Sequence, residues 1–198
     1  MHQTRTSGTW LAAALMALGL SCGAARAEGQ KSTTPARHET YSDDEVVGAA
    51  NDFFKNGAQD LGKVLQKVLK EKGQPVAIIR GEEAGGAIGV GLRYGHGELV
   101  FKGGAGQKVY WEGPSIGFDV GANAVKVFAL VYGLPSGERL YRRFPGVEGS
   151  LYFVGGFGVN YVQQGSTAIA PVRFGVGWRQ GLSLSYMKFS AQKTINPF

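Results

Sequence analysis

Few residues of this 198-residue chain have the types and spacing needed for chemistry, and the one catalytic motif stands in an unsuitable context. Gly113–Gly117 reads G-P-S-I-G, which matches the G-x-S-x-G pattern of serine hydrolases. That motif places its serine on a sharp turn between a strand and a helix. Here Ser115 begins an alternating segment typical of a strand, and His96 is the only histidine after the N-terminal region. An esterase is therefore not expected.

Acidic and histidine side chains also lack the spacing of a catalytic or metal site. Glu82 and Glu83 are adjacent, and we interpret them as a solvated acidic turn rather than as paired acid–base carboxylates. His96 lies between two glycines without a second ligand at metal spacing, and His38 is expected to be solvated. Glycine pairs recur, but the third glycine of a dinucleotide-binding loop is missing. We expect no enzyme activity, no metal and no cofactor.

The best candidate for an interaction site is the segment 139–144, R-L-Y-R-R-F. In an extended chain Arg139, Tyr141 and Arg143 share one face and Arg142 lies opposite. Guanidinium groups suit phosphate or carboxylate, and the tyrosine ring could stack on a sugar. We therefore name these four residues as a candidate patch for an anionic or glycan ligand. The alternative is an exposed strand end that its charges keep soluble.

Glycine dominates the elements that must position these residues, with 32 in the chain, about twice the average usage of ~7%. In residues 84–100, AGGAIGVGLRYGHGELV, the even positions from 88 to 94 carry large side chains and most odd positions carry glycine. A period of two is typical of a strand. Looser copies follow at 116–121, 154–162 and 172–179. We expect long strands with bulk on one face, and we favour that face as the inward one.

Turn signals divide the region after residue 74 into ten segments, which we expect to form about eight strands. The expected strand segments are Pro75–Arg80, Ala84–Tyr94, Glu98–Lys102, Gln107–Trp111, Pro114–Gly121, Val125–Tyr132, Glu138–Phe144, Gly149–Val162, Ala168–Arg179 and Leu182–Ser190. About eight strands can close into a barrel, which removes the edges that apolar strands would expose. The fold class is therefore mainly β: a small, Gly-rich antiparallel β-barrel over residues 74–198.

An amphipathic helical segment, residues 42–73, precedes the barrel and forms one domain with it. Ser42 and Glu45 have the spacing of a capping box. Apolar residues follow at helical spacing, Asn56-Gly57 is expected to break or bend the helix, and Gly73 is expected to end it. We expect the apolar stripe to pack on the sheet. Because the opposite face is basic, a helix on a membrane surface is the alternative.

The N-terminus has the features of a secretory signal peptide, residues 1–27. Arg5 precedes a short apolar run at 10–20, and A-R-A at 25–27 predicts cleavage after Ala27. A lipoprotein signal ending at Cys22 is the alternative, although Gly19 stands where that signal normally has leucine. Residues 28–41 are polar and are expected to form a flexible linker.

Cleavage at that position has two consequences. The mature chain loses its single cysteine, and its net charge falls by two from +6 to +4 because two arginines leave with the signal. A mildly basic surface suits lipid headgroups or phosphorylated glycans. Nucleic acid is not an expected partner of an exported chain, and we expect the protein in the periplasm.

Several segments together resemble the alphaproteobacterial envelope-integrity protein A family, long regarded as a domain of unknown function. They are GEEAGGAIGVGLRYGHGEL, KVYWEGPSIGFDVGA, YRRFPGVEGS, APVRFGVGWR and the terminal INPF, within residues 43–198. Ile195 stands where the family would have tryptophan, and Gly86 where it would have a small polar residue. The resemblance implies a soluble periplasmic eight-stranded barrel that maintains the cell envelope under stress. It implies no catalytic residues.

Three functions remain open from the sequence. The first is a non-enzymatic periplasmic barrel that supports envelope integrity through an unidentified lipid, glycan or protein partner. The second is a small outer-membrane barrel, although several expected strands fall short of the ~9–11 residues needed to cross a membrane. The third is a glycine-rich lipid-binding module of the SYLF kind, supported only by glycine spacing. On the first reading the protein is not an integral membrane protein.

Overall fold

The structure is a computed structural model that describes residues 38–55, 59–119, 124–174 and 186–194. At residues 59, 86–90 and 115–119 it describes the backbone alone. The expected signal peptide and its cleavage site at Ala27, the Asn56-Gly57 break and the terminal INPF lie outside the described residues. Elements within the described ranges are α1 Asp43–Phe54, α2 Gln59–Lys72, β1 Ala77–Phe101, β2 Gly106–Asp119, β3 Val125–Tyr132, a 3-10 helix Gly137–Leu140, β4 Arg143–Pro145, β5 Tyr152–Val154, β6 Phe157–Val159, β7 Val162–Gln164, β8 Thr167–Phe174 and β9 Tyr186–Ser190.

The start of α1 and the end of α2 are as the sequence predicts. The Ser42 hydroxyl accepts from the Glu45 backbone N–H at 3.3 Å, and the Glu45 carboxylate accepts from the Ser42 N–H at 2.7 Å, which completes the capping box. At the end of α2, Gly73 has a φ of +76° and its N–H donates to the Leu69 carbonyl. α1 ends at Lys55, which has a left-handed φ of +56°. The predicted helical segment is therefore two helices.

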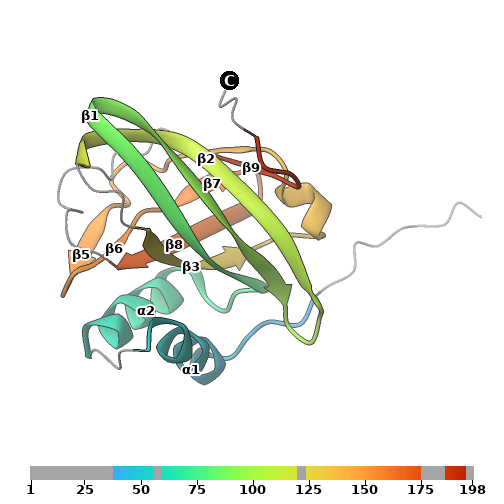
Figure 1. The fold of residues 1–198 in the computed structure, drawn as a ribbon. Coiled ribbons are helices and arrows are strands. Elements are labelled where there is room, and N and C mark those ends of the chain that lie inside the picture. Colours follow the sequence, from blue (N-terminus) through green and yellow to red (C-terminus); the bar gives the residue numbers. More distant parts are fainter. Residues whose placement is uncertain (1–37, 56–58, 120–123, 175–185, 195–198) are drawn as a thin grey trace, which may run out of the picture. The chain divides into compact units, whose positions relative to one another are not determined.

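The strands form one antiparallel sheet in the order β4-β9-β2-β1-β3-β8-β6-β5, and β7 pairs with β8 (Figure 1). β6 and β7 pair with successive parts of the same strand, β8. A β-bridge between Gly146 and Val162 then joins the residue after β4 to β7, and the Val147 N–H donates to the Tyr161 carbonyl. The sheet therefore closes on itself, which confirms the expected Gly-rich antiparallel barrel.

β1 and β2 are longer than predicted. The turns expected at 81–83 and 95–97 are absent, because β1 is continuous from Ala77 to Phe101. Its first part pairs with β3 and its second part with β2. The Lys102 N–H donates to the Val76 carbonyl, so the two ends of β1 are neighbours and the strand doubles back. A Cβ on Gly81 would collide with the backbone of His96 and Gly97, so glycine permits this close approach.

After β2, one expected strand keeps its bounds and another is divided at glycines. β3 has the predicted bounds. The segment expected as one strand at 149–162 is instead divided into β5, β6 and the first residue of β7, and Gly155 and Gly156 adopt φ values of +55° and +85° in the turn between β5 and β6. Left-handed backbone at both glycines ends one strand and starts the next. The continuation of β8 expected up to 179 falls outside the described residues.

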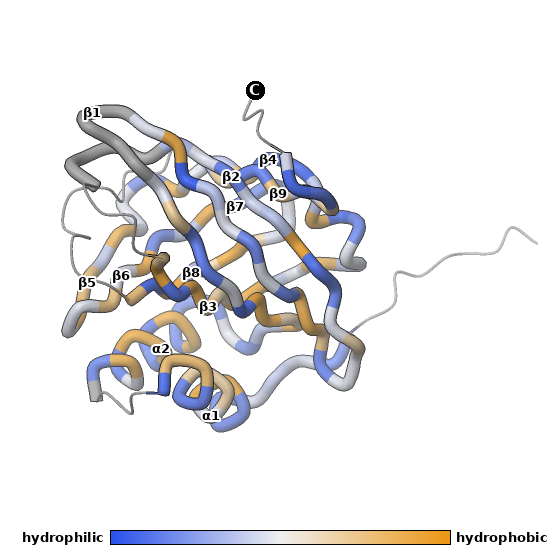
Figure 2. Tube along the Cα trace, viewed as in Figure 1, coloured by the Kyte–Doolittle hydropathy of each residue, from blue (hydrophilic) through white to orange (hydrophobic). Residues whose placement is uncertain are grey.

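Buried side chains form two layers on opposite faces of the sheet. The inner core lies inside the barrel and includes Val127, Ala129 and Val131 of β3. The outer core lies between the sheet and the helices, and includes Phe128 and Leu130 of the same strand. Both faces of β3 are therefore buried. Figure 2 shows hydrophobic residues along both helices and the strands next to them, as expected from the apolar stripe.

The expected orientation of β1 is wrong where its side chains are described. Arg93 and Leu99, at odd positions, are buried, whereas Leu92 and Tyr94, at even positions, are half-buried and belong to neither core. The glycine-rich face therefore points inward. The physical reason is the indole of Trp111, which lies directly against Gly95 and occupies the space of a side chain there.

Candidate functional site

Three places in the described structure bring polar side chains together. They are a charged cluster inside the barrel, a pocket with two arginines, and a surface groove with two tyrosines. The cluster is built from Glu83, Arg93, Trp111, Asn160 and Arg173.

The charged cluster centres on Glu83, which is 3% exposed. Arg173 Nε donates to Glu83 Oε1 at 2.7 Å, and Arg93 Nη1 lies 3.4 Å from the same oxygen. Trp111 Nε1 donates to Glu83 Oε2 at 3.1 Å, and Arg173 Nη1 donates to Asn160 Oδ1 at 2.7 Å. Because β1, β2 and β8 each supply a residue, the cluster ties separate strands together inside the barrel.

Electrostatics keep this cluster ionised. Burial acts to raise the pKa of Glu83, but the guanidinium groups of Arg173 and then Arg93 outweigh it, so the pKa is lowered. Burial lowers the pKa of Arg173 to about 10, which leaves it charged at neutral pH. A carboxylate held ionised between two guanidinium groups is poorly suited to take up a proton. The cluster is a structural ion network.

Sequence reasoning missed this cluster, because Glu83 was interpreted as part of a solvated turn. In β1 the neighbouring carboxylates point to opposite faces, so Glu82 is exposed and Glu83 is buried. The signal that could have found it was on the glycine-rich faces, where Arg93 and Arg173 are two of the few charged residues.

The predicted patch at 139–143 is not one strand face. Arg139 lies in the 3-10 helix, Tyr141 follows that helix, and only Arg143 belongs to a strand, β4. The alternation failed because the helical turn rotates each residue by about a third of a circle. Tyr141 instead accepts a hydrogen bond from the Gln107 amide, and Arg143 lies over the Tyr186 ring at 4.3 Å.

Two of the four predicted residues, Arg139 and Arg142, do come together in what we call the arginine pocket. The pocket has a volume of about 350 Å³, and its other polar side chains are Ser136, Gln164, Ser166 and Thr167. Arg142 Nη2 donates to Thr167 Oγ1 at 3.5 Å. Arg142 Nε is buried and lacks a hydrogen-bond partner among the described residues. This pocket can offer guanidinium and hydroxyl groups to an anion.

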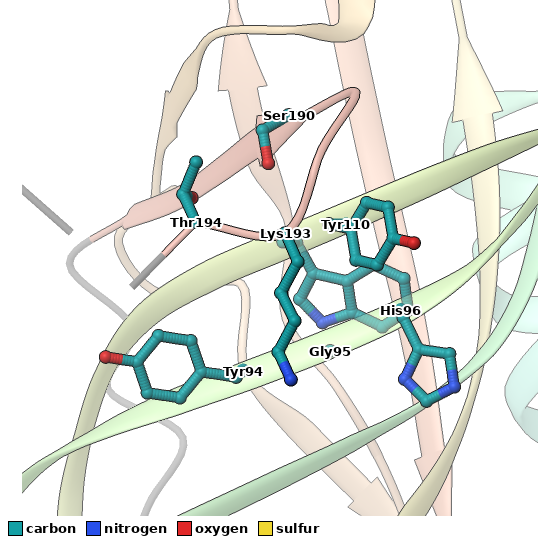
Figure 3. Close-up of a pocket in the computed structure, with 8 residues that line it drawn as sticks. Tyr94, Gly95, His96, Tyr110, Ser190, Lys193 and Thr194 are labelled. Carbon is teal, nitrogen blue, oxygen red and sulfur yellow. The ribbon is translucent and has the colours of Figure 1, made fainter. Parts of the chain in front are cut away.

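A second surface site, the tyrosine groove, lies on the outer face of β1 and β2 (Figure 3). Its volume is also about 350 Å³, and it is lined by Tyr94, Gly95, His96, Tyr110, Trp111, Ser190, Lys193 and Thr194. The register explains the cluster, because His96 pairs with Tyr110 across the two strands and Tyr94 is two residues along on the same face. Sequence reasoning left these residues unassigned, apart from the doubt about His96 as a metal ligand.

The segment after β9 forms one wall of the tyrosine groove. Thr194 Oγ1 donates to Glu112 Oε2 at 3.3 Å, and Lys188 Nζ lies 3.0 Å from Glu112 Oε1. The Ser190 hydroxyl donates to the Gln192 carbonyl at 2.7 Å, which shapes the turn before Lys193. Glu112 therefore holds this wall against β2, and its own exposed fraction is only 2%.

The remaining candidates from the sequence, Ser115 and His38, lie in places that do not form a catalytic or metal site. Gly113–Gly117 lies within β2, so Ser115 is not at a strand–turn–helix elbow. His38 is not simply solvated, since its ring stacks on Phe101 at 4.2 Å and its Nε2 lies 2.9 Å from the Pro135 carbonyl oxygen. Among the described residues, no group of three or more His, Cys, Asp or Glu side chains could hold a metal ion. No described helix is both long and apolar enough to cross a membrane.

Comparison with known proteins gives a consistent result. A family model described as envelope integrity protein A matches residues 39–198. The fold is similar to the crystal structure of a beta-barrel-like, uncharacterized protein from Brucella abortus, with a TM-score of 0.74 and 39% sequence identity over 80% of this chain and 99% of that chain. No curated protein matches the chain. These matches confirm the resemblance predicted from the motifs.

Proposed function

Since this chain belongs to the envelope integrity protein A family, we propose that it is a non-enzymatic periplasmic protein that supports the envelope by binding one of its anionic components. The proposed ligand carries a phosphate or carboxylate, and binds in the arginine pocket. Such groups occur on both lipid headgroups and envelope glycans. The family gives the envelope role, and the site and ligand are our proposal.

The observation that carries the proposal is the convergence of Arg139 and Arg142 on one pocket. Guanidinium groups bind carboxylate and phosphate in a bidentate manner, and the hydroxyls of Ser136 and Ser166 can donate to the remaining oxygens. Arg142 Nε, which is buried without a partner among the described residues, is a donor that an anion could satisfy.

Two further features favour a soluble periplasmic protein. The N-terminal 27 residues have the pattern of a cleavable signal peptide. The outer face of β3 and β8 is covered by α1 and α2, so its apolar side chains contact protein instead of lipid. Release of the tagged protein by osmotic shock would support this location. Retention in the membrane fraction until detergent is added would contradict it and favour the outer-membrane alternative.

The site is tested by complementing a strain that lacks the gene. The double variant Arg139→Ala/Arg142→Ala is expected to fail to restore survival in detergent, although it accumulates to the same level as the unchanged protein. The matched control is Arg143→Ala, which removes an exposed arginine of the same segment outside the pocket. Full rescue by the double variant would overturn the proposed site.

Binding experiments then distinguish the source of the anion. The purified protein is incubated with anionic phospholipid vesicles in one arm and with phosphorylated lipopolysaccharide-derived polysaccharide in the other. If the double variant loses binding to only one of the two, to the vesicles or to the polysaccharide, that one is the source of the anion. Binding in neither arm, or binding that the double variant leaves unchanged, would contradict the proposal.

A further inference from the structure

We propose that the tyrosine groove is a second, independent binding site, and that it takes a sugar ring that carries a carboxylate. Tyr94 and Tyr110 are half-buried and present aromatic surface, whereas His96, Ser190, Lys193 and Thr194 supply polar groups around it. A volume of about 350 Å³ suits a ligand of one or two rings, at the lower end of the ~300–1,000 Å³ typical of small-molecule sites.

This mixture matches a saccharide better than an acyl chain. A sugar ring has apolar C–H faces, which stack on aromatic rings, and hydroxyl edges that need hydrogen-bond partners. Figure 3 shows the Tyr94 and Tyr110 rings on either side of the Lys193 side chain, with His96 beside them. An acyl chain would desolvate the His96 imidazole and the Lys193 ammonium group without offering them hydrogen bonds.

The backbone of the groove argues against a peptide that adds a strand. Gly95 and His96 pair with Trp111 and Tyr110 on β2, and the far edge of β2 pairs with β9 at Ser190 and Phe189. At Tyr110 and Trp111 the backbone of β2 is therefore paired on both sides, with β1 and with β9. Addition of a strand requires an exposed sheet edge, which β2 does not offer there.

The carboxylate is inferred from Lys193. Its ammonium group has three donors and no acceptor, so it favours an anionic substituent over a neutral hydroxyl. The segment that carries it is held by the hydrogen bond from Thr194 to Glu112. Glu112 is thus a positioning residue, because it fixes the wall of the groove without lining it.

The floor also provides a way to observe binding. Trp111 lies under Gly95, where a Cβ would collide with its indole, and its Nε1 donates to Glu83 in the charged cluster. A ring that stacks on Tyr94 or Tyr110 would sit close to this indole. Resonances of Gly95 and of the Trp111 indole N–H should therefore shift on binding.

Two sugars that differ by one acidic substituent provide the test. N-acetylmuramic acid carries a lactyl carboxylate that N-acetylglucosamine lacks. Each is titrated into the purified protein, and the amide and indole resonances are followed by NMR. We expect both sugars to shift Gly95 and the Trp111 indole, and the acidic sugar to bind more tightly.

The variants separate stacking from charge. Tyr110→Ala should weaken binding of both sugars about tenfold, whereas Tyr110→Phe, which keeps the ring, should stay within about threefold of the unchanged protein. Lys193→Ala should remove the preference for the acidic sugar and leave the neutral sugar unaffected. Tyr186→Ala is the matched control, because Tyr186 is half-buried outside the groove.

The outcome is independent of the proposed function. Arg139→Ala/Arg142→Ala should leave both sugar titrations unchanged, so failure of one site does not imply failure of the other. The groove proposal would be overturned if neither sugar shifts these resonances at millimolar concentration. It would also be overturned if Tyr110→Ala folds and binds the sugars as tightly as the unchanged protein does. Shifts caused by phospholipid vesicles but by neither sugar would also overturn it.

Discussion

The inner and outer cores share strands β3 and β8 but are built on different principles. The outer core is apolar apart from its tyrosine hydroxyls, of which Tyr161 donates to Glu71 and Tyr152 to the Val64 carbonyl. The inner core contains apolar residues together with Glu83, Arg93 and Arg173, all at least 95% buried. The outer layer is held mainly by apolar packing, and the inner layer also depends on a set of buried charges.

This difference changes how each layer should respond to damage. An apolar layer loses stability in proportion to the volume removed, because its neighbours relax only in part. A buried ion network loses more when one member is removed, because the remaining charges are left in a medium that solvates them poorly. The inner core should therefore be sensitive to single charge changes that leave the shape of a side chain intact.

The largest effect is expected from Glu83→Gln, which keeps the shape but removes the charge that faces Arg93 and Arg173. We expect a loss of about 3–5 kcal/mol in the free energy of unfolding, measured by urea denaturation. Glu82→Gln is the control, because the Glu82 carboxylate is exposed, and it should change stability by less than about 0.5 kcal/mol. Equal effects of the two variants would mean that the cluster does not hold the barrel.

In the outer core, Leu65→Ala removes a fully buried side chain of α2. We expect a loss of about 2–4 kcal/mol from transfer and cavity terms. Gln66→Ala, on the exposed side of the same helix, should be nearly neutral. If Leu65→Ala proved as mild as Gln66→Ala, α2 would not be part of the cooperative fold, and the comparison of two cores would reduce to one.

Two glycines test whether the space around a residue or its helix propensity decides the effect of Gly→Ala on stability. Gly81→Ala should destabilise by about 1–3 kcal/mol, because its Cβ would meet the backbone of His96 and Gly97 and the indole of Trp111. Gly62→Ala in α2 meets nothing within 4 Å and should stabilise by up to about 1 kcal/mol through helix propensity. Thermal melts of both variants give opposite shifts if this is right. If Gly81→Ala proved neutral, the two parts of β1 that meet at Gly81 and Gly97 could move apart without loss of stability.

Local patterns predicted much of this architecture. The capping box at Ser42, the helix end at Gly73 and the strand at 125–132 all followed from local spacing, because each depends on neighbours within a few residues. The closed Gly-rich sheet followed instead from the number of expected strands, whose open edges closure removes. The turns predicted inside β1 were wrong because glycine has two uses. It ends strands where φ is positive, as at Gly155, and it permits close contact inside a strand, as at Gly81. Composition does not separate these uses.

The sites were harder to predict, because each depends on contacts distant in sequence. Arg139 and Arg142 meet residues 164–167 only after the sheet closes, and the strand alternation that selected Tyr141 and Arg143 was replaced by a 3-10 turn. Glu83 and Arg173 are 90 residues apart. The tyrosine groove needs the β1–β2 register and the segment after β9, neither of which has a local signal.

The smallest expected effect lies outside both cores, at the start of α1. Glu45 accepts hydrogen bonds from the Ser42 backbone and from Lys102, and these lower its pKa to about 2. Because the folded-state pKa is below the unfolded value of about 4.3, this contact stabilises the protein above that value, and the contribution is lost as pH falls through about 2. Glu45→Gln should therefore lower the melting temperature at neutral pH. The melting temperature of this variant should also fall less in acid than that of the unchanged protein.

The control for that experiment is Asp44→Asn, an exposed acidic residue in the same turn. It should keep the acid decline that Glu45→Gln reduces. Because the Glu45–Lys102 pair is partly exposed, added salt should shrink the difference between Glu45→Gln and the unchanged protein. Glu83→Gln should respond much less to salt, since its partners are buried. If salt acted on both variants alike, the charges inside the barrel would be reachable by solvent, and the inner core would not be the closed layer described above.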